Sequence, residues 1–439
     1  MRREAGGGKF VPPPPVGGGR GRGGWGIALG AGLLAIVLPV FAQTPSADLE
    51  ISLLTFGSGE IYWQRYGHNA LLVRNRETAT AVVYNYGMFD FGEKNFLLNF
   101  ARGRMQYRLA AHGLDQTLAH YQAEGRWILE QPLDLDATAR TQLAEFLQWN
   151  ARPENARYPY DYFLSNCSTR VRDALDTVLG GELRRQTESR LTARSWRSEV
   201  SRLSAPDRLM MLGMDAALGP AADHPLNLWQ AAFVPGHLAQ ALRDLRLPAA
   251  AGGTRPLVKD ERLLSPGRLP EPAAAPPDLR LPFLLAGLLL ALALGGLDRI
   301  RSRPAARRVF SGLAVWLTLV CGLGGLLLAA LWGLTAHWGA WGNPNLLLFN
   351  PLALLLLPLW WVAARADWRP ALWARGLLTL IVLGAALTAL LRLMPALSQQ
   401  NLHWILLLLP PQLLLLWAVL RRRQPETCNN RALKIDPMS

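Results

Sequence analysis

The sequence predicts an α+β domain followed by an all-α bundle of about five transmembrane helices. Residues 281–420 hold apolar runs long enough to cross a bilayer. Residues 43–246 instead mix short stretches rich in β-branched and aromatic residues with helical patterns. The net charge of +14 arises outside residues 43–280, which carry 27 basic and 27 acidic residues. These observations indicate a membrane protein with one neutral soluble domain.

The first 42 residues predict that the soluble domain is exported. Residues 1–24 are rich in Gly, Pro and Arg, and residues 25–42 form a short apolar run before Gln-Thr-Pro-Ser. This pattern is typical of a signal peptide cut after Ala42, or of a retained anchor. Either alternative places residues 43–246 outside the cytoplasm.

The rest of the chain divides by composition. Residues 247–280 are rich in Pro, Ala and Gly, so we expect a linker there, and residues 421–439 form a polar tail. The membrane helices are expected near residues 281–297, 310–334, 346–364, 377–395 and 402–420.

The basic residues orient the bundle. They cluster in the loop around Arg301, in the loop around Arg369 and in the tail from Arg421, whereas residues 337–345 and 395–401 carry no formal charge. Since basic loops stay in the cytoplasm, the pattern predicts an inner-membrane protein with its soluble domain in the periplasm. It argues against a nucleic-acid partner, because the charge lies beside the membrane segments.

A β-hairpin is predicted around residues 66–87. Both arms are rich in β-branched and aromatic residues, and residues 75–78 between them are polar. If Arg74 pairs with Ala79, His68 faces Asn85 on one side of the sheet, with Cβ atoms roughly 5 Å apart. An amide oxygen there could accept from one imidazole nitrogen and leave the other free to act as a base.

A helix is predicted to start at Cys167. It runs through Val178 and ends at Gly180, and either Ser165 or Asn166 can cap its start. We expect the helix dipole and the first-turn N–H groups to stabilise a Cys167 thiolate, and the same groups could bind an oxyanion. Cys167 and His68 are thus candidates for a thiol nucleophile and its base.

Each of these residues also has a structural interpretation. A single cysteine is more often a buried small apolar residue, His68 could be a structural histidine, and Asn85 could serve the turn before Gly87. The other two cysteines lie in an apolar helix (Cys321) and in the tail (Cys428). Histidines 112, 120, 224 and 237 lack the close spacing of metal ligands, so no metal site is expected.

Several motifs together resemble one protein family. They are Tyr-Gly-His-Asn at 66–69, Tyr-Asn-Tyr-Gly-Met-Phe-Asp-Phe at 84–91, residues 100–107 with Gly103, Tyr-Pro-Tyr-Asp-Tyr-Phe at 158–163, Asn-Cys-Ser-Thr-Arg at 166–170 and Phe-Val-Pro at 233–235. This set is similar to the Lnb-type bacterial lipoprotein N-acyltransferases. The likeness continues into the membrane part through His337, Asn343, Asn345, Asn350 and Pro351.

The order of a histidine strand and then an Asn-Cys helix also resembles the lecithin–retinol acyltransferase group. That resemblance implies a permuted papain-like fold in which the cysteine carries a fatty acyl chain as a thioester. Members of that group usually have a second histidine where Asn85 stands here. Asp90 and Asp161 are therefore alternative third members of the site.

The family resemblance implies a cysteine-dependent acyltransferase that needs no cofactor. A membrane phospholipid would donate the acyl chain, and the N-terminal amine of a diacylated lipoprotein would accept it. The implied catalytic residues are Cys167, His68 and Asn85. The implied supporting residues are Asn166, Ser168, Thr169, Asn69, Tyr160 and Asp161.

The outer loop, residues 337–345, joins two tryptophans to polar residues. His337, Asn343, Asn345 and the nearby Asn350 are either lipid contacts or parts of an interfacial anchor with a capped helix start. A basic group is similarly either a set of phosphate contacts or a solvated face. It consists of Arg102, Arg104 and Arg108.

Two other functions suit the same residues. A membrane-anchored thiol hydrolase, acting on cell-wall peptides or phospholipids, would use Cys167 and His68 with water as the acceptor. A membrane scaffold or lipid-binding protein would leave Cys167 unreactive toward thiol probes. Five membrane helices exceed what a tether requires, which favours chemistry on lipids.

Overall fold

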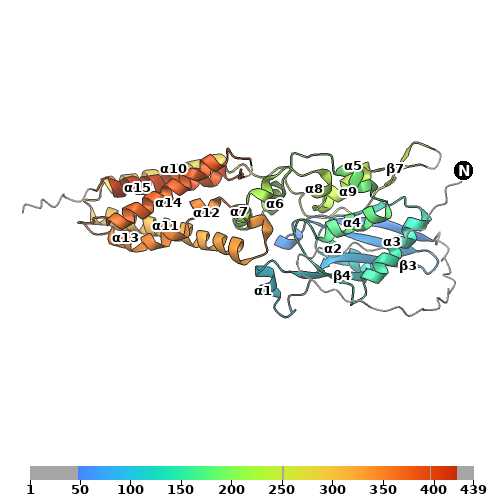
Figure 1. Ribbon diagram of the computed structural model, residues 1–439. Helices are drawn as coiled ribbons and strands as arrows, with labels where there is room; N and C mark the ends of the chain where they lie inside the picture. Colours follow the sequence, from blue (N-terminus) through green and yellow to red (C-terminus); the bar gives the residue numbers. More distant parts are fainter. Residues whose placement is uncertain (1–47, 250–251, 396, 423–439) are drawn as a thin grey trace, which may run out of the picture.

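A computed structural model describes residues 48–249, 252–395 and 397–422. The expected signal peptide, Cys428 and the tail beyond residue 422 lie outside these residues. The molecule is elongated, with the helical bundle at one end and the α+β domain at the other (Figure 1). The predicted fold class is thereby confirmed.

A seven-stranded antiparallel sheet forms the centre of the α+β domain. The strands lie in the order β6-β4-β3-β2-β1-β5-β9. Their bounds are β1 Leu49–Phe56, β2 His68–Asn75, β3 Thr80–Met88, β4 Gln106–Gly113, β5 Ile128–Pro132, β6 Arg157–Pro159 and β9 Arg262–Ser265.

Helices cover both faces of the sheet, and for this reason the central strands are apolar on both sides. Leu53 and Leu71 belong to the core that packs against α3 (Ala137–Asn150), α4 (Cys167–Val178) and α9 (Pro235–Asp244). Leu54 and Leu72 face the opposite way, toward α2 (Leu114–Ala123).

Shorter helices complete the domain. Among them α6 and α7 lie between the sheet and the bundle, and α1 lies at the end of the domain nearest the bundle (Figure 1). Their bounds are η1 Tyr62–Gln64, α1 Phe96–Ala101, α5 Glu182–Thr187, α6 Trp196–Ser204, α7 Arg208–Ala217, η2 Pro220–Asp223 and α8 Leu228–Ala231.

Three strands lie in or overlap the segment whose composition suggested a linker, residues 247–280. β7 (Arg246–Pro248) and β8 (Thr254–Pro256) form a hairpin, and β9 pairs with the open edge of β5. Composition gave no indication of the β5 edge, whose backbone groups need partners. The soluble domain thus continues to Ser265.

Five helical spans are long and apolar enough to cross a membrane, as predicted. Four are continuous, and the third consists of three short helices. The continuous spans are α10 Arg280–Arg299, α11 Pro304–Leu334, α14 Leu372–Leu391 and α15 Leu402–Leu420. The third span, Asn345–Val362, contains α12 Asn345–Leu348, η4 Pro351–Leu356 and α13 Leu357–Val362.

The break in the third span has a local cause. Pro351 has no N–H to continue the helix, and the Asn350 side chain instead accepts a hydrogen bond from the N–H of Leu352 at 3.0 Å. A Cβ on Gly325 of α11 would lie 2.1 Å from the Phe349 carbonyl oxygen. This glycine therefore lets the broken span pack directly against α11.

Buried polar contacts join the domain to the bundle. The last carbonyls of α7 accept hydrogen bonds from the side chains of Asn343 and Asn345, and Gly219 N–H donates to the Gly339 carbonyl at 2.7 Å. The carboxylate of Asp215 on α7 accepts from the ring N–H groups of His403 and Trp404, both at 2.7 Å. We call this set of contacts the junction.

Candidate functional site

The predicted hairpin is present with a shifted register. Arg74 pairs with Ala81, and not with Ala79 as we expected. The turn begins one residue later because the Asn75 side chain accepts the N–H groups of Glu77 and Thr78. The shift is two positions along β3, so each side chain stays on its predicted face.

Despite the register shift, His68 and Asn85 make the expected hydrogen bond. Nε2 of His68 donates to Oδ1 of Asn85 at 3.2 Å, from a diagonal rather than a directly opposed position. The Asn85 amide is oriented by its other end, where Nδ2 donates to the Val83 carbonyl at 3.2 Å. Because Asn85 Oδ1 can only accept, Nε2 carries the proton, and Nδ1 of neutral His68 has a free lone pair.

His68 is held in its neutral form. Its ring lies 6.0 Å from the stacked ring of Tyr121, which in turn stacks on Phe56 at 3.7 Å. Burial lowers the pKa of His68 to about 3, the nearby Arg126 charge adds to this effect, and the hydrogen bond to Asn85 opposes it. A neutral imidazole is the form that can accept a proton.

Cys167 is the first residue of α4, as predicted. Asn166 caps the helix, since its side chain accepts the N–H groups of Ser168 and Thr169, both at 2.9 Å, and Thr169 completes a capping box. The Asn166 amide also donates to the carbonyls of Tyr162 and Phe233, both at 2.9 Å. These bonds fix where the helix starts, and with it the place of the sulfur.

The start of α4 meets the sheet at the residues next to His68 and Asn85. A Cβ on Gly87 would lie 3.3 Å from the Cβ of Cys167, and Gly87 has a φ of +87°. The backbone N–H of Asn69 lies near the Cys167 sulfur, where it lowers the pKa of the thiol. The structure therefore brings Cys167, His68 and Asn85 to one end of the β2–β3 hairpin.

The resting state of the sulfur differs from our expectation of an ionised thiolate. Burial raises the pKa of the Cys167 thiol, and this outweighs the backbone N–H groups of Asn69 and Ser168, which lower it. Two first-turn N–H groups are already bonded to Asn166, which reduces what the helix start can offer to an anion. At rest Cys167 is therefore a thiol and His68 a neutral imidazole, and both residues remain partly exposed.

The predicted supporting residues form a buried network under Cys167. Ser168 Oγ bonds to Asn69 Oδ1 at 2.9 Å and to the Ala232 carbonyl at 2.6 Å, and Asn69 Nδ2 donates to Thr55 Oγ1 at 2.9 Å. Asn69, Ser168 and Thr169 are each completely buried. Their side chains therefore position β2 against α4 and do not themselves point at a substrate.

Tyr160 and Asp161 have separate roles. Tyr160 stacks on Tyr107 with 4.1 Å between ring centroids; burial raises the pKa of its hydroxyl, and the nearby Cys167 adds to this effect. Asp161 instead accepts a hydrogen bond from the Trp338 indole N–H at 2.7 Å. Asp90 is an exposed turn residue that accepts the Gly92 N–H. Neither aspartate is the partner of His68.

The outer-loop residues bond to the soluble domain. His337 Nε2 donates to the Phe100 carbonyl at 3.1 Å, and its ring stacks with Tyr162. Asn343 and Asn345 are buried in the junction, and Asn345 Oδ1 also accepts from Asn401 at 2.8 Å. These asparagines therefore hold the two parts of the molecule together, a role that the sequence analysis did not foresee.

Three residues of the site were not assigned to it from the sequence. Nδ1 of His112 on β4 lies 3.3 Å from Nδ2 of Asn85, so a second imidazole stands behind the amide. Arg126 is buried, its guanidinium lies 4.6 Å from the Tyr121 ring, and its Nη2 has no partner among the described residues. Gly87 is the third. Gly87 belongs to the Tyr-Asn-Tyr-Gly motif at 84–87, which could have drawn attention to it, whereas His112 and Arg126 belong to none of the motifs.

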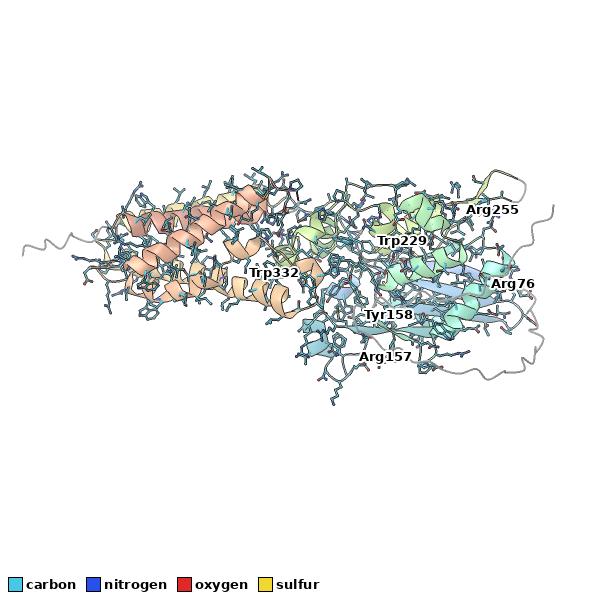
Figure 2. All side chains as sticks on the ribbon, in the orientation of Figure 1. Arg76, Arg157, Tyr158, Trp229, Arg255 and Trp332 are labelled. Atoms are coloured by element: carbon cyan, nitrogen blue, oxygen red, sulfur yellow. The ribbon has the colours of Figure 1, made fainter. Side chains whose placement is uncertain are left out.

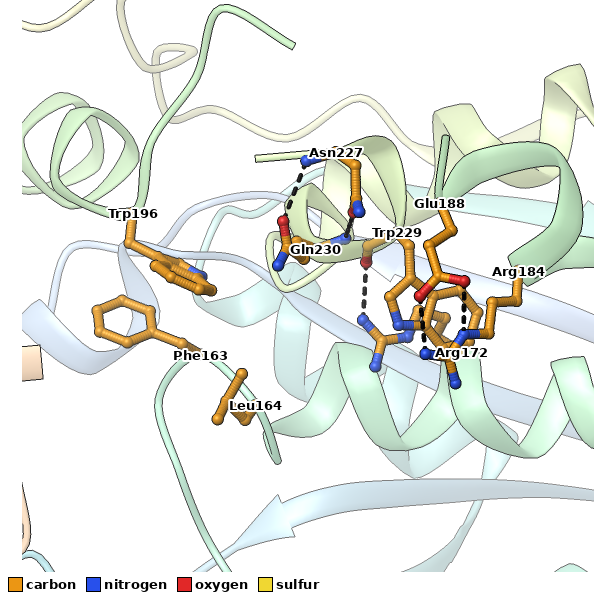
Figure 3. A pocket seen from close by; sticks show the side chains of 9 residues that line it. All are labelled: Phe163, Leu164, Arg172, Arg184, Glu188, Trp196, Asn227, Trp229 and Gln230. Carbon is orange, nitrogen blue, oxygen red and sulfur yellow. Dashed lines mark hydrogen bonds and ion pairs between the residues drawn. The ribbon is translucent and has the colours of Figure 1, made fainter. Parts of the chain in front are cut away.

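No group of three or more His, Cys, Asp or Glu side chains that could hold a metal ion occurs among residues 48–249, 252–395 and 397–422. A cavity of about 200 Å³ lies beside α4 and α8 (Figure 3), and its lining includes neither His68 nor Asn85. Its cations are already bonded: Arg184 pairs with Glu188, and Arg172 stacks on Trp229. We assign it no role.

Comparison with protein families now identifies both parts of the chain. Residues 40–200 match the Lnb N-terminal periplasmic domain, and residues 277–420 match the Lnb transmembrane domain. The chain carries both domains of the Lnb family. In this Lnb-family protein the sheet and the thiol site belong to the periplasmic part, and the five spans form the membrane part.

Comparisons with curated proteins and with solved structures give no match. The expected likeness to permuted papain-like folds therefore has no support from a known structure. The Lnb-family chain is a multi-pass membrane protein with a periplasmic domain.

Proposed function

We propose that this protein is a lipoprotein N-acyltransferase of the bacterial inner membrane. It moves a fatty acyl chain from a membrane phospholipid, through a thioester on Cys167, to the N-terminal amine of a diacylated lipoprotein. The observation that carries the proposal is the set of three at the hairpin end. His68 is oriented by Asn85 with one nitrogen free, and Cys167 begins a capped helix beside them.

The first half-reaction forms the thioester. His68 Nδ1 takes the proton of the Cys167 thiol as the sulfur attacks an ester carbonyl of the phospholipid. The C–O bond breaks, the imidazolium returns the proton to the leaving glycerol oxygen, and a lysophospholipid departs. Because the thiol and the imidazole are both neutral at rest, charge develops only during the attack.

The second half-reaction uses the same groups in reverse. The lipoprotein amine attacks the thioester carbonyl and gives up a proton to His68 as the C–S bond breaks. The sulfur then leaves as a thiolate and recovers that proton. The product is an amide, and the reaction needs no cofactor or outside energy source.

Both substrates are lipids, which agrees with the architecture. The junction holds the periplasmic domain against one end of the membrane spans. On this proposal, that end faces the periplasm and brings the site close to its lipid substrates. A tethered hydrolase of soluble peptides would need neither five spans nor a fixed junction.

The decisive experiment replaces Cys167 with Ala. In a strain that lacks its own N-acyltransferase, the wild-type chain should restore triacylated lipoproteins, and the Cys167→Ala chain should accumulate in the membrane without restoring them. Mass spectrometry of a lipoprotein N-terminus measures the outcome, with Cys321→Ala as the matched control. Restoration by Cys167→Ala would refute the mechanism.

A second measurement separates transfer from hydrolysis. Purified protein mixed with acyl-labelled phospholipid should carry the label on Cys167, and the label should move to a diacylated lipopeptide when one is added. Release of the label as free fatty acid, without transfer, would instead identify a phospholipase.

A further inference from the structure

Exposed large apolar side chains cluster in one place on the periplasmic domain. In the described part of residues 48–270, eleven such side chains are exposed, and six belong to two short segments that touch. We call these six residues the apolar surface: Ile61, Tyr62, Trp63, Phe91, Leu97 and Leu98.

Ring contacts join the two segments of the apolar surface. Trp63 lies edge-on to Phe91 at 5.5 Å, and Phe91 contacts Phe96 of α1 at 5.1 Å. The helix α1 is apolar on its outer side as well, because Phe96 is buried while Leu97 is 73% exposed and Leu98 46% exposed. A helix that faced water would carry polar residues there.

The apolar surface lies beside the outer end of a membrane span. Just after α1, the Arg102 carbonyl accepts the N–H of Ala336 at 2.8 Å, only two residues beyond the end of α11. The last turn of α11 carries exposed Trp332 and Leu334, and Trp332 lies where the bundle meets the soluble domain (Figure 2). Figure 1 shows α1 at this same end of the domain.

Basic side chains flank the apolar surface. Lys94, Arg102 and Arg104 are exposed, and within the described residues their side chains make no hydrogen bond or ion pair. Cations next to exposed aromatic and aliphatic residues are typical of surfaces that enter the headgroup region of a bilayer. A solvated face alone would not explain the exposed leucines.

We propose that the apolar surface is inserted into the periplasmic-side leaflet of the membrane that holds the bundle. The lipid of that leaflet is the partner: its acyl chains contact Leu97 and Leu98, and its phosphates contact the flanking cations. The distance along the chain supports this placement, because α11 ends only two residues before Ala336, whose N–H bonds to the Arg102 carbonyl.

Aromatic side chains connect the inserted surface to the thiol site. Trp63 contacts Phe89 at 6.1 Å, Phe89 contacts Tyr107 at 5.0 Å, and Tyr107 stacks on Tyr160 at 4.1 Å, next to Cys167. Given the proposed function, this series of rings is the path by which an acyl chain passes from the leaflet to the sulfur.

Lipid-borne quenchers test the insertion without any need for catalysis. In a chain with Cys167, Cys321 and Cys428 replaced by Ser, a fluorescent label is placed by Leu97→Cys or, as the control, by Leu191→Cys. Leu191 is 75% exposed but belongs to neither segment of the apolar surface. In vesicles of phosphatidylethanolamine and phosphatidylglycerol with brominated acyl chains, quenching at position 97 should exceed quenching at position 191 by about twofold or more. Equal quenching would overturn the proposal.

Acidic substitutions in the apolar surface test whether phospholipid reaches the thiol site through it. Leu97→Glu with Leu98→Glu should slow thioester formation from vesicle phospholipid by about tenfold but leave the rate with a short-chain monomeric phospholipid unchanged. The control pair is Leu191→Glu with Leu263→Glu, which should change neither rate. If the wild type forms no thioester, the proposed function fails while the quenching result stands. Equal slowing with both lipids would overturn the role as a lipid path.

Discussion

The thiol site and the junction use histidine in opposite ways. In the thiol site the oxygen that His68 contacts belongs to an uncharged amide, Asn85. In the junction His403 donates to the carboxylate of Asp215, which also pairs with Arg197. A carboxylate partner favours an imidazolium, whereas an amide does not. The amide partner therefore leaves His68 of the thiol site neutral, whereas the Asp215 carboxylate of the junction serves to hold the two parts of the molecule together.

The pKa values follow the same division. Burial alone would raise the pKa of Asp215, but the hydrogen bond from His403 and the charge of Arg197 lower it. At the site, burial lowers the pKa of His68 and raises that of the Cys167 thiol. In the junction, the buried charges of Asp215 and Arg197 hold the two parts of the molecule together. In the thiol site, Cys167 and His68 are partly buried and neutral, so on the proposed mechanism the thiol keeps a proton that the imidazole can accept.

Removing the base should have the largest effect. His68→Ala should slow thioester formation by about 10³-fold, since general base catalysis supplies roughly that factor. The melting temperature should change little. The control is His120→Ala, a surface histidine of α2 with 65% of its side chain exposed, which should act as wild type. An active His68→Ala protein would remove this histidine from the mechanism.

Breaking the junction should reduce stability rather than chemistry. Asp215→Asn leaves the buried Arg197 with one carboxylate fewer, which should cost about 3 kcal/mol in the free energy of unfolding. Thioester formation per folded molecule should stay within about threefold of wild type. Thermal unfolding in detergent measures the first quantity, and Asp260→Asn, at an exposed pair, is the control. An unchanged unfolding temperature would contradict the role of the junction.

Exchanging the Asn85 amide for a carboxylate should change the protonation of His68. With the pKa of His68 at about 3, the imidazole is unprotonated throughout neutral pH, and the wild-type rate should be flat from about pH 5 to 8. Asn85→Asp should raise the pKa of His68, so that the rate falls on the acid side of this range. Asn85→Ala should lower the rate by about tenfold without the new acid limb. Identical pH profiles for Asn85→Asp and wild type would contradict this account.

The smallest effect is expected at Gly87. An added Cβ would sit 3.3 Å from the Cβ of Cys167, at a φ of +87°, so Gly87→Ala should cost about 1–2 kcal/mol and slow the reaction up to about tenfold. Gly213→Ala, where an added Cβ meets nothing within 4 Å, should leave the rate unchanged. A fully active Gly87→Ala chain would show that Cys167 has more room than the structure gives it.

Local patterns were enough to predict the hairpin, the helix at Cys167 and the five spans, because each depends on residues close in sequence. The register error shows the limit of this reasoning. The Asn75 side chain decides where the turn begins, but the period of two in a strand left His68 and Asn85 on their predicted face.

Contacts between distant segments could not be predicted in this way. Asn343 bonds to carbonyls 126 and 127 positions earlier in the chain, and nothing near either segment indicates the other. The state of the sulfur was misjudged for the same reason. The helix start is a local feature, but the burial that raises the thiol pKa depends on how the whole domain packs around Cys167.

If the proposed transfer is the function, the hydrogen bond between Gly219 and Gly339 has a consequence for substrate choice. Together with the neighbouring asparagine contacts it would hold the sulfur at one height above the lipid, so the site would act as a steric gauge. A lipoprotein whose folded part follows its lipidated cysteine at once would lack clearance beneath the sheet. One with a long flexible spacer would fit, and the length of that spacer would sort acceptors.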